Sequence, residues 1–532
     1  MTLPDDYAER VYAGVLGKTI GVYLGRPFEG WTYERIQARL GDIEYYVHDK
    51  VGVPLLVTDD DIAGTFAFLR TLMDNGFDPE LSAQAMGEGW LNYLIEGKTV
   101  LWWGGLGNST EHTAYLRLKN GVKAPVSGSA ALNSQVVSEQ IGAQIFIDGW
   151  AMVSPGDPDQ AAKLAERAAK VSHDGEAVHG AVALAGREAM AFVERDTNRL
   201  LDKALEYIPG DSVIASMIGD IRRWHQREPD WRVAREMLSE QYGYDTYGGN
   251  CHIVPNHGLI ILALLYGNDD FSDTLKIINT CGWDTDCNSG NLGCLMGIKE
   301  GLAGIDVGLS RGLDWRGPVA DRIYVPTADP SWSISDCVLE TQHIVNAALA
   351  LRGDQAWRPK SGAQFHFDMP GSVQGFTVTD GDGVITNQLG VSQAGQHALR
   401  LQGQGLARFG TPTFAPSADF AAWTEQSWNP YPLIASPRVY PGQILNATLL
   451  QGEGASVRLY VAYYDANDDV QRVYSAAQPV NERADLSFSI PEQAFPAFEV
   501  GVETAGTVYL DCLGWSGEPH YIGTRPPGRR RG

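Results

Sequence analysis

Residues 59–76 have the sequence DDDIAGTFAFLRTLMDNG, which combines a helical pattern with a run of acidic residues. Ile62, Phe66 and Leu69 recur at steps of four and three residues, the spacing of one face of an α-helix. Three consecutive aspartates precede this face, where side chains meet the free amides and the positive end of the helix dipole. The stretch therefore predicts a helix with concentrated negative charge at its N-terminus.

The acidic run TDDD at residues 58–61 has two interpretations. One is N-capping of the helix, for which a single aspartate suffices. The other is a bound divalent cation, because three adjacent carboxylates repel one another unless a positive charge compensates them. Both interpretations stay open for this motif taken alone.

A second acidic motif lies at residues 281–293, CGWDTDCNSGNLG. Asp284 and Asp286 flank Thr285 in a loop rich in Gly and Asn, again just before an apolar helical pattern. An Asx-rich turn is the simpler explanation. The layout nevertheless matches the first motif, and oxygen ligands suit Mg²⁺, Mn²⁺ or Ca²⁺ rather than zinc.

The first 350 residues or so have helical spacing throughout, with no regular strand alternation. We expect helices from about residues 158 and 176, and a last helix over 334–353 that ends on Gly353. Two more are expected at 274–280 and 291–305. This half predicts one all-α domain over residues 1–355.

After residue 360 the pattern changes to short alternating runs separated by Gly, Pro, Asn and Asp. In one run, Val457, Leu459 and Val461 would share a face of a half-buried strand. Many short strands at regular spacing are typical of an antiparallel sandwich, which we place at 360–523, followed by a basic tail at 524–532. The expected strands are 363–369, 375–380, 397–403, 445–451, 456–465, 484–491, 497–504 and 507–515. The fold prediction is thus a multidomain chain, all-α and then all-β.

Composition excludes several classes of protein. The chain has 532 residues and a formal net charge of −24, which disfavours nucleic acid and anionic membranes as partners. No apolar run approaches the roughly 18 residues of a membrane span, and no secretory signal precedes the first helix. The six cysteines form neither a disulfide framework nor a common zinc pattern, so we expect a reduced, cytoplasmic protein. The oligomeric state stays open.

The order of the motifs resembles the ADP-ribosylglycohydrolase family, of the dinitrogenase reductase-activating glycohydrolase type. The resemblance covers residues 8 to about 305. Its segments are GVLGKTIGVYLGRPFEG at 14–30, TDDD at 58–61, NSQVVSEQIGAQIF at 133–146, VSHDGEAVHGA at 171–181 and GWDTDCN at 282–288. The two acidic motifs in this order carry most of the resemblance.

The resemblance implies an all-α domain with a binuclear Mg²⁺ centre. Its ligands, carried over to this sequence, are Thr58, Asp59, Asp60, Asp284 and Asp286. The family's last ligand is a threonine, and Cys287 replaces it here. Because a thiol is a poor ligand for Mg²⁺, we expect one or two ions, with Mn²⁺ or Ca²⁺ as alternatives. Asn288 is an alternative oxygen donor.

Other positions depart from the family pattern. The family's Gly-Asp in the first helix is Gly17-Lys18 here. The nearest counterpart of a family glutamate at the reaction centre is Glu29, which has a surface-loop carboxylate as its alternative interpretation. His173 matches the family's Thr-His position, with Ser172 before it, and is a candidate substrate contact or a packed residue.

Further candidates for substrate binding come from polar and aromatic loops. Trp103, in LWWGGLGNSTEHTAY, is suited to stacking on a sugar or a base, or belongs to the core. Asn250 and Asn256 would hydrogen-bond hydroxyls or serve in turns and caps, and Asn133 opens the family's central segment. No cluster of Lys and Arg suited to a pyrophosphate accompanies these loops; the nearest bases are Arg26 and Lys18.

These residues predict a metal-dependent glycoside hydrolase for a small-molecule substrate with an ADP-ribosyl or related ribofuranosyl bond. Asp60 or Asp284 would activate the water, with Glu29 as acid or substrate ligand. A glycosidase for nucleosides, other furanosides or oligosaccharides is the alternative, and a non-catalytic binding protein is the third. The short alternating strands of the sandwich resemble those of carbohydrate-binding modules. Its Trp423, Trp428 and Tyr431 are candidates for a sugar platform or for packing against the helical domain.

Overall fold

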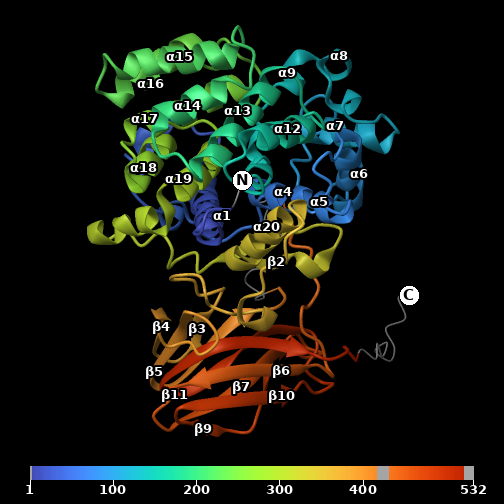
Figure 1. Cartoon of the computed structure of the whole chain (residues 1–532), viewed down its shortest axis with the longest axis vertical. Coiled ribbons are helices and arrows are strands. Elements are labelled where there is room, and N and C mark those ends of the chain that lie inside the picture. The colour runs from blue at the N-terminus through green and yellow to red at the C-terminus, as the bar shows by residue number, and fades with distance from the viewer. Residues whose placement is uncertain (1–2, 416–430, 521–532) are drawn as a thin grey trace. The chain divides into compact units, whose positions relative to one another are not determined.

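The computed structural model describes residues 3–415 and 431–520. The chain forms two compact units (Figure 1): residues 1–357 with 423–434, and residues 358–422 with 435–532. Trp423, Trp428 and the predicted tail at 524–532 lie outside the described residues.

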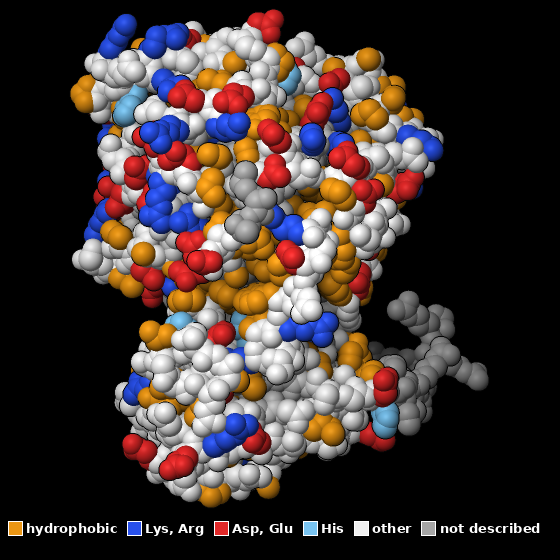
Figure 2. Space-filling model, viewed as in Figure 1, with side chains coloured by type: hydrophobic (Ala, Val, Ile, Leu, Met, Phe, Trp, Pro, Cys, Tyr) orange, Lys and Arg blue, Asp and Glu red, His pale blue; other side chains and the backbone are white. Residues whose placement is uncertain are grey.

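The first unit is helical, as predicted. No helix in the described ranges has the length and apolar character needed to cross a membrane. On the face shown in Figure 2, Lys and Arg side chains alternate with Asp and Glu over this unit. The α-helices are α1 (Tyr7–Gly25), α2 (Tyr33–Arg39), α3 (His48–Val51), α4 (Asp60–Leu69), α5 (Thr71–Asp74), α6 (Ala83–Tyr93), α7 (Thr110–Lys119), α8 (Ala130–Asn133), α9 (Gln135–Ser138), α10 (Gly142–Ile145), α11 (Asp148–Met152), α12 (Pro158–Ala169), α13 (Glu176–Ala191), α14 (Thr197–Leu205), α15 (Val213–His225), α16 (Trp231–Tyr242), α17 (Ile253–Tyr266), α18 (Phe271–Thr280), α19 (Thr285–Asp306) and α20 (Cys337–Leu351).

The expectation that this unit lacks strands was wrong at one place. Strands β1 (Arg322–Tyr324) and β2 (Ile334–Asp336) form an antiparallel pair just before α20. The last helix therefore begins at Cys337 and not at residue 334. Asp336 ends the strand and caps the helix, because its carboxylate accepts hydrogen bonds from the amides of Val338 and Leu339.

Glycines let α1 and α19 pack backbone to backbone (Figure 1). A Cβ atom added at Gly17 would lie 2.1 Å from the carbonyl oxygen of Gly293, and one at Gly21 would lie 2.0 Å from that of Ser289. At Gly25 the nearest atoms belong to Thr285, 2.5 Å away. The two helices are antiparallel, so the end of α1 lies against the second acidic motif at the start of α19.

Lys18 lies in this core as a buried ion pair. Its ammonium is 2.7 Å from Asp148 Oδ2 and donates a hydrogen bond to the Ile145 carbonyl. Burial alone would lower the pKa of Lys18, but the carboxylates of Asp148 and Asp61 together more than offset this and raise it to about 12. The base that replaces the family's aspartate thus ties α1 to the end of α10 and the start of α11.

The second unit is an antiparallel β-structure, again as predicted. Its strands are β3 (Thr377–Asp380), β4 (Gly383–Leu389), β5 (His397–Pro412), β6 (Ile444–Leu450), β7 (Ala455–Tyr464), β8 (Val470–Tyr474), β9 (Gln478–Val480), β10 (Arg483–Ser489) and β11 (Ala497–Ser516). Val457, Leu459 and Val461 are buried together in its core. Strands β4, β8 and β9 were not anticipated, and residues 363–369 contribute only a bridge between Phe365 and Leu513.

The two strands expected at 497–504 and 507–515 are one strand, β11. A register shift between Ala505 and Gly506 bends it without ending it. Its first half pairs with β7 and its second half with β6, while β5 runs along both halves. The turn residues that seemed to separate two strands instead allow one strand to join both parts of the sheet.

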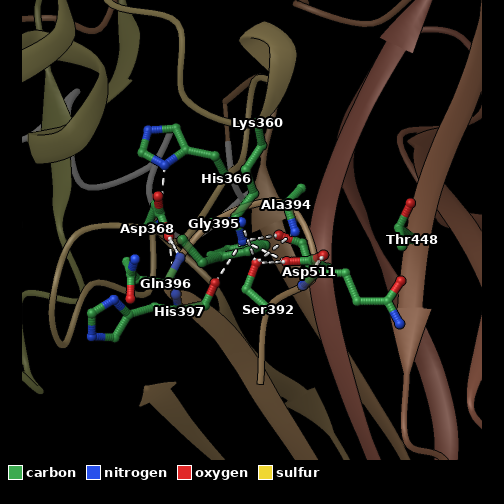
Figure 3. A network of polar contacts seen from close by, with 12 residues as sticks. Lys360, His366, Asp368, Ser392, Ala394, Gly395, Gln396, His397, Thr448 and Asp511 are labelled. Atoms are coloured by element: carbon green, nitrogen blue, oxygen red, sulfur yellow. Dashed lines mark hydrogen bonds and ion pairs between the residues drawn. The ribbon is translucent and has the colours of Figure 1, made fainter. Parts of the chain in front are cut away.

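A buried polar network connects the start of this unit to β11 (Figure 3). The Lys360 ammonium donates to Asp511 Oδ1 at 2.6 Å, to the Asp511 carbonyl at 2.8 Å and to the His397 carbonyl at 2.5 Å. Ser392 donates to the same carboxylate oxygen of Asp511. All three ammonium protons have acceptors, so the buried charge is compensated.

The helix contact leads to a stability prediction. We expect Gly21→Ala to lower the free energy of unfolding by about 3 kcal/mol, because its Cβ would overlap a backbone carbonyl that cannot rotate away. Urea unfolding followed by circular dichroism measures the change. Gly210→Ala is the control, since a Cβ there meets nothing within 4 Å. Equal stability of the two variants would contradict the proposed contact.

The network in the second unit leads to another prediction. Lys360→Met should destabilise the protein by about 3 kcal/mol or more, because it leaves the Asp511 carboxylate buried without a positive partner. The double variant Lys360→Met/Asp511→Asn should recover part of that loss in the same unfolding assay. If the double variant were less stable than the single one, the ion pair would not be the source of the effect.

Candidate active site

Within the helical unit, the two acidic motifs border one cavity of about 480 Å³. The wall combines carboxylates with aromatic rings from segments far apart in sequence. The carboxylates are Glu29, Asp60, Asp61, Glu111, Asp284 and Asp286, and the aromatic residues are Trp102, Tyr244, Trp283 and Tyr431.

The first motif serves both as a cap and as part of the cavity wall. Asp59 is the N-cap of α4, and its Oδ1 accepts a hydrogen bond from the Asp61 amide at 3.0 Å. One carboxylate is therefore enough to cap the helix, as expected from the sequence. The next two, Asp60 and Asp61, lie in the first helical turn and line the cavity.

The second motif is held by an unusual backbone conformation. Trp283 has φ of 68°, in the left-handed region that favours glycine. Its amide donates to the Trp31 carbonyl, and its own carbonyl accepts from Gly30, each at 2.8 Å. This pairing brings the loop of Glu29 beside Asp284 and Asp286, so that oxygens of the three carboxylates lie within 4.8 Å of one another.

Asp284 is at the N-cap of α19 but makes no capping hydrogen bond with its side chain. Its Oδ1, and Oδ2 of Asp61, are buried without a hydrogen-bond partner among the described residues. A buried polar atom without a partner is unfavourable unless a ligand, water or ion supplies one. Both atoms belong to residues that line the cavity.

The pKa values of the clustered carboxyl groups also favour a bound ion. Burial raises the pKa of Asp60, and the neighbouring carboxylates of Asp59 and Glu29 raise it further. Burial and then Glu29 raise the pKa of Asp286, and burial raises that of Asp284 to about 7. The cluster thus lacks positive charge, a deficit that a cation would offset.

Arg26 follows α1 directly and supplies part of that charge. Its Nε is 3.1 Å from Asp59 Oδ2, and its Nη1 is 3.8 Å from Asp286 Oδ2 and also pairs with Glu29. One guanidinium therefore bridges both motifs. The sequence suggested Arg26 as a base for a pyrophosphate, but its charge already faces three carboxylates.

The donor set fits a hard cation. Three overlapping groups have ligand atoms within 4.8 Å: Glu29/Asp284/Asp286, Asp59/Asp60/Asp61 and Asp61/Asp286/Cys287. All but the thiol of Cys287 are oxygen donors, which Mg²⁺ prefers. Burial raises the pKa of Cys287, and its thiol donates weakly to Asp61 Oδ1 at 3.4 Å. That thiol is therefore a poor ligand here.

Most of the helical unit, residues 3–333, matches the ADP-ribosylglycohydrolase family. The chain belongs to the ADP-ribosylglycohydrolase family. Membership implies glycosyl hydrolase activity. A search of curated proteins returned no match.

Several solved structures are similar to part of the chain. An "ADP-ribosylglycohydrolase-related protein complex" is 17% identical, with a TM-score of 0.43, over 66% of this chain and 100% of that one. A xylan-binding domain of carbohydrate-binding family 22 is 16% identical over 30% and 95% of the two chains, with a TM-score of 0.22. Another, from Paenibacillus barcinonensis, is 14% identical over 28% and 90%, with a TM-score of 0.21. Likeness at this level carries no argument about ligands.

Of the residues predicted to bind substrate in this glycohydrolase, Asn250 lines the cavity. Asn256 lies behind the wall and holds it. Its amide donates to the Tyr244 hydroxyl at 2.8 Å, and its oxygen accepts from Asn288 at 2.9 Å and from the Asp284 amide at 3.4 Å. Asn256 thus orients both an aromatic wall and the second acidic motif.

Three other predicted residues do not line the cavity of the glycohydrolase. Trp103 donates to the Thr99 carbonyl, and its neighbour Trp102 lines the cavity instead. The side-chain amide of Asn133 accepts a hydrogen bond from Arg117 and donates one to the Ser127 carbonyl. 

His173 is also buried away from the cavity wall. Its Nε2 lies 3.6 Å from Oε1 of Glu111, a lining residue. Burial lowers the pKa of His173 to about 3, so the imidazole is neutral. Its place favours support of Glu111 over direct contact with a substrate.

Thr58 is fully buried, and its hydroxyl donates to the backbone carbonyl of Tyr431. Asp61, the third acid of the run, was part of the predicted cation site but was not among the ligands carried over from the family. The lining residues Glu111, Tyr244 and Trp283 were not predicted. Trp283 adjoins the second acidic motif, whereas nothing local marks Glu111 or Tyr244.

The role of Arg26 is open to a direct measurement. Arg26→Gln should lower the free energy of unfolding by about 3 kcal/mol in a buffer with chelator, because carboxylates of both motifs lose their positive partner. Urea unfolding reports the change. Arg223→Gln removes an exposed pair with Asp220 and should cost less than about 1 kcal/mol. An Arg26 variant as stable as the control would refute this electrostatic account.

Proposed function

We propose that this chain is a metal-dependent glycohydrolase that cleaves a ribofuranosyl bond with water. The observation that carries the proposal is the convergence of two separate acidic motifs on one cavity, with buried carboxylate oxygens that have no hydrogen-bond partner in the described part of the chain. Family membership supports the glycosidic bond as the target.

Thr58, Asp59 and Asp60 from one motif, and Asp284 and Asp286 from the other, would hold one or two Mg²⁺ ions. The hydroxyl of Thr58 is buried next to Asp59 and donates to the Tyr431 carbonyl. A bound ion supplies Lewis-acid chemistry, orienting ribose hydroxyls and making a water molecule more acidic. The thiol of Cys287 favours the lower number of ions.

Asp60 or Asp284 takes the proton of the attacking water. Both line the cavity, and a raised pKa makes a carboxylate a better proton acceptor. As the bond to the leaving group breaks, positive charge would develop on the ribose, and the remaining carboxylates would stabilise it. Glu29, which also lines the cavity, would accept a hydrogen bond from a ribose hydroxyl.

A substrate without pyrophosphate is the second candidate, and one observation favours it. None of the described residues that line the cavity is Lys or Arg. A pyrophosphate is normally bound by such side chains or by helix N-termini, and the helix N-termini at this cavity, those of α4 and α19, carry aspartates that repel an anion. Four aromatic rings in the wall instead suit a planar group such as a nucleobase.

Turnover by point variants tests the proposal. Asp60→Asn and Asp284→Asn should each lower kcat by about 10²-fold or more, because both remove a carboxylate placed for proton transfer. Release of ribose from p-nitrophenyl ribofuranoside, and of ADP-ribose from an ADP-ribosylated peptide, would be followed with Mg²⁺ and with chelator. Asp202→Asn, an exposed aspartate paired with Arg222, is the control.

The outcomes separate the three functions. Loss of activity with chelator and in both variants supports metal-dependent hydrolysis. Hydrolysis of the aryl riboside alone selects the substrate class without pyrophosphate. No hydrolysis of either substrate by the wild-type protein with Mg²⁺ would sink the proposal and leave a binding protein.

A further inference from the structure

One wall residue of the cavity comes from outside the part of the chain that matches the family. Tyr431 lies almost a hundred residues beyond the end of that match at residue 333. The described residues 431–434 nevertheless belong to the helical unit. Tyr431 is 4% exposed and lines the cavity with Asp60 and Trp283.

The backbone of Tyr431 is attached to the first acidic motif. Its carbonyl accepts the hydrogen bond of Thr58, the residue next to the N-cap Asp59. Pro432 follows Tyr431 directly and restricts it to extended backbone conformations. These two constraints hold the Tyr431 backbone beside the first acidic motif.

The phenol itself lies within the field of the cluster. Burial raises the pKa of Tyr431, and the charge of Asp60 raises it further, while Arg26 acts in the opposite direction. The ring is thus neutral and next to the carboxylate proposed to activate water. At this position the Tyr431 ring would contact the leaving group of a substrate whose ribose lies against the carboxylates.

Two other aromatic residues of the wall are held in place by their neighbours. Tyr244 and Trp283 meet edge to face with ring centroids 5.3 Å apart, and the Tyr244 hydroxyl accepts a hydrogen bond from Asn256. The Arg235 guanidinium lies 5.3 Å from the Trp283 ring centroid. These two rings lie within the family-matched region, whereas Tyr431 lies outside it.

We propose that Tyr431 is a specificity-determining residue, whose ring stacks on a planar leaving group of the ribofuranoside. This inference rests on the proposed function for the ribose part of the site. It extends that function by giving the leaving group a chemical class, an aromatic ring such as a nucleobase or aryl group. It also gives Tyr431, which lies outside the family match, a role in the chemistry of the helical unit.

Binding measurements on the full chain test the proposal without turnover. Calorimetry would compare p-nitrophenyl ribofuranoside with methyl ribofuranoside, which has no planar leaving group, using Asp284→Asn as the background. Adding Tyr431→Leu should weaken the aryl riboside about tenfold or more, as expected for loss of a stacking ring. Binding of the methyl riboside should change by less than about twofold, and Tyr431→Phe should restore the aryl affinity.

Two controls distinguish stacking from a structural role. Tyr242→Leu removes a buried tyrosine of the helical unit that does not line the cavity, and it should leave the affinity ratio unchanged. Equal weakening of both ribosides by Tyr431→Leu, or no weakening of either, overturns the proposal. If the aryl riboside does not bind the Asp284→Asn background, the comparison is made on the otherwise wild-type protein, where failure of the aryl riboside to bind overturns the proposal. If binding follows the prediction but the wild-type protein hydrolyses neither riboside, the proposed hydrolysis fails while the role of Tyr431 stands.

Discussion

The contact between α1 and α19 is the constraint on which the site depends. Gly17, Gly21 and Gly25 allow the two backbones to touch, and no side chain separates them. As a consequence, the end of α1, with Arg26, lies beside the start of α19, with its two aspartates. Side chains between these helices would move both acidic motifs apart, because helices spaced by ordinary side chains lie about 8–10 Å from axis to axis.

The charge in the cavity follows from how the two helices begin. A helix N-terminus needs only one carboxylate, and Asp59 meets that need at α4. The remaining aspartates are held in the first turn with no protein partner for some of their oxygens. Charge that is not needed for capping is thereby concentrated at one place, and it is balanced in part by Arg26. The formal net charge of −24 for the whole chain does not reveal this local excess of negative charge.

Much of the architecture could be predicted from periodicity, and the failures have physical causes. The helix at 59–76 was found because its apolar face repeats over several turns. Strands β1 and β2 have three residues each, too few for any period to show. The register shift at Ala505 and Gly506 resembled a turn, because a bulge and a turn use the same kinds of residue.

The sequence by itself determined the chemistry: two oxygen-rich motifs, each before a helix, in the order of a glycohydrolase family. Tertiary structure alone decided which of these atoms face a common cavity and which serve the fold. Asn133 and His173 are held by local partners, whereas Glu111 and Tyr431 reach the cavity from distant segments. The physical reason is that a local pattern specifies how a segment folds, but close packing between segments specifies what its side chains meet.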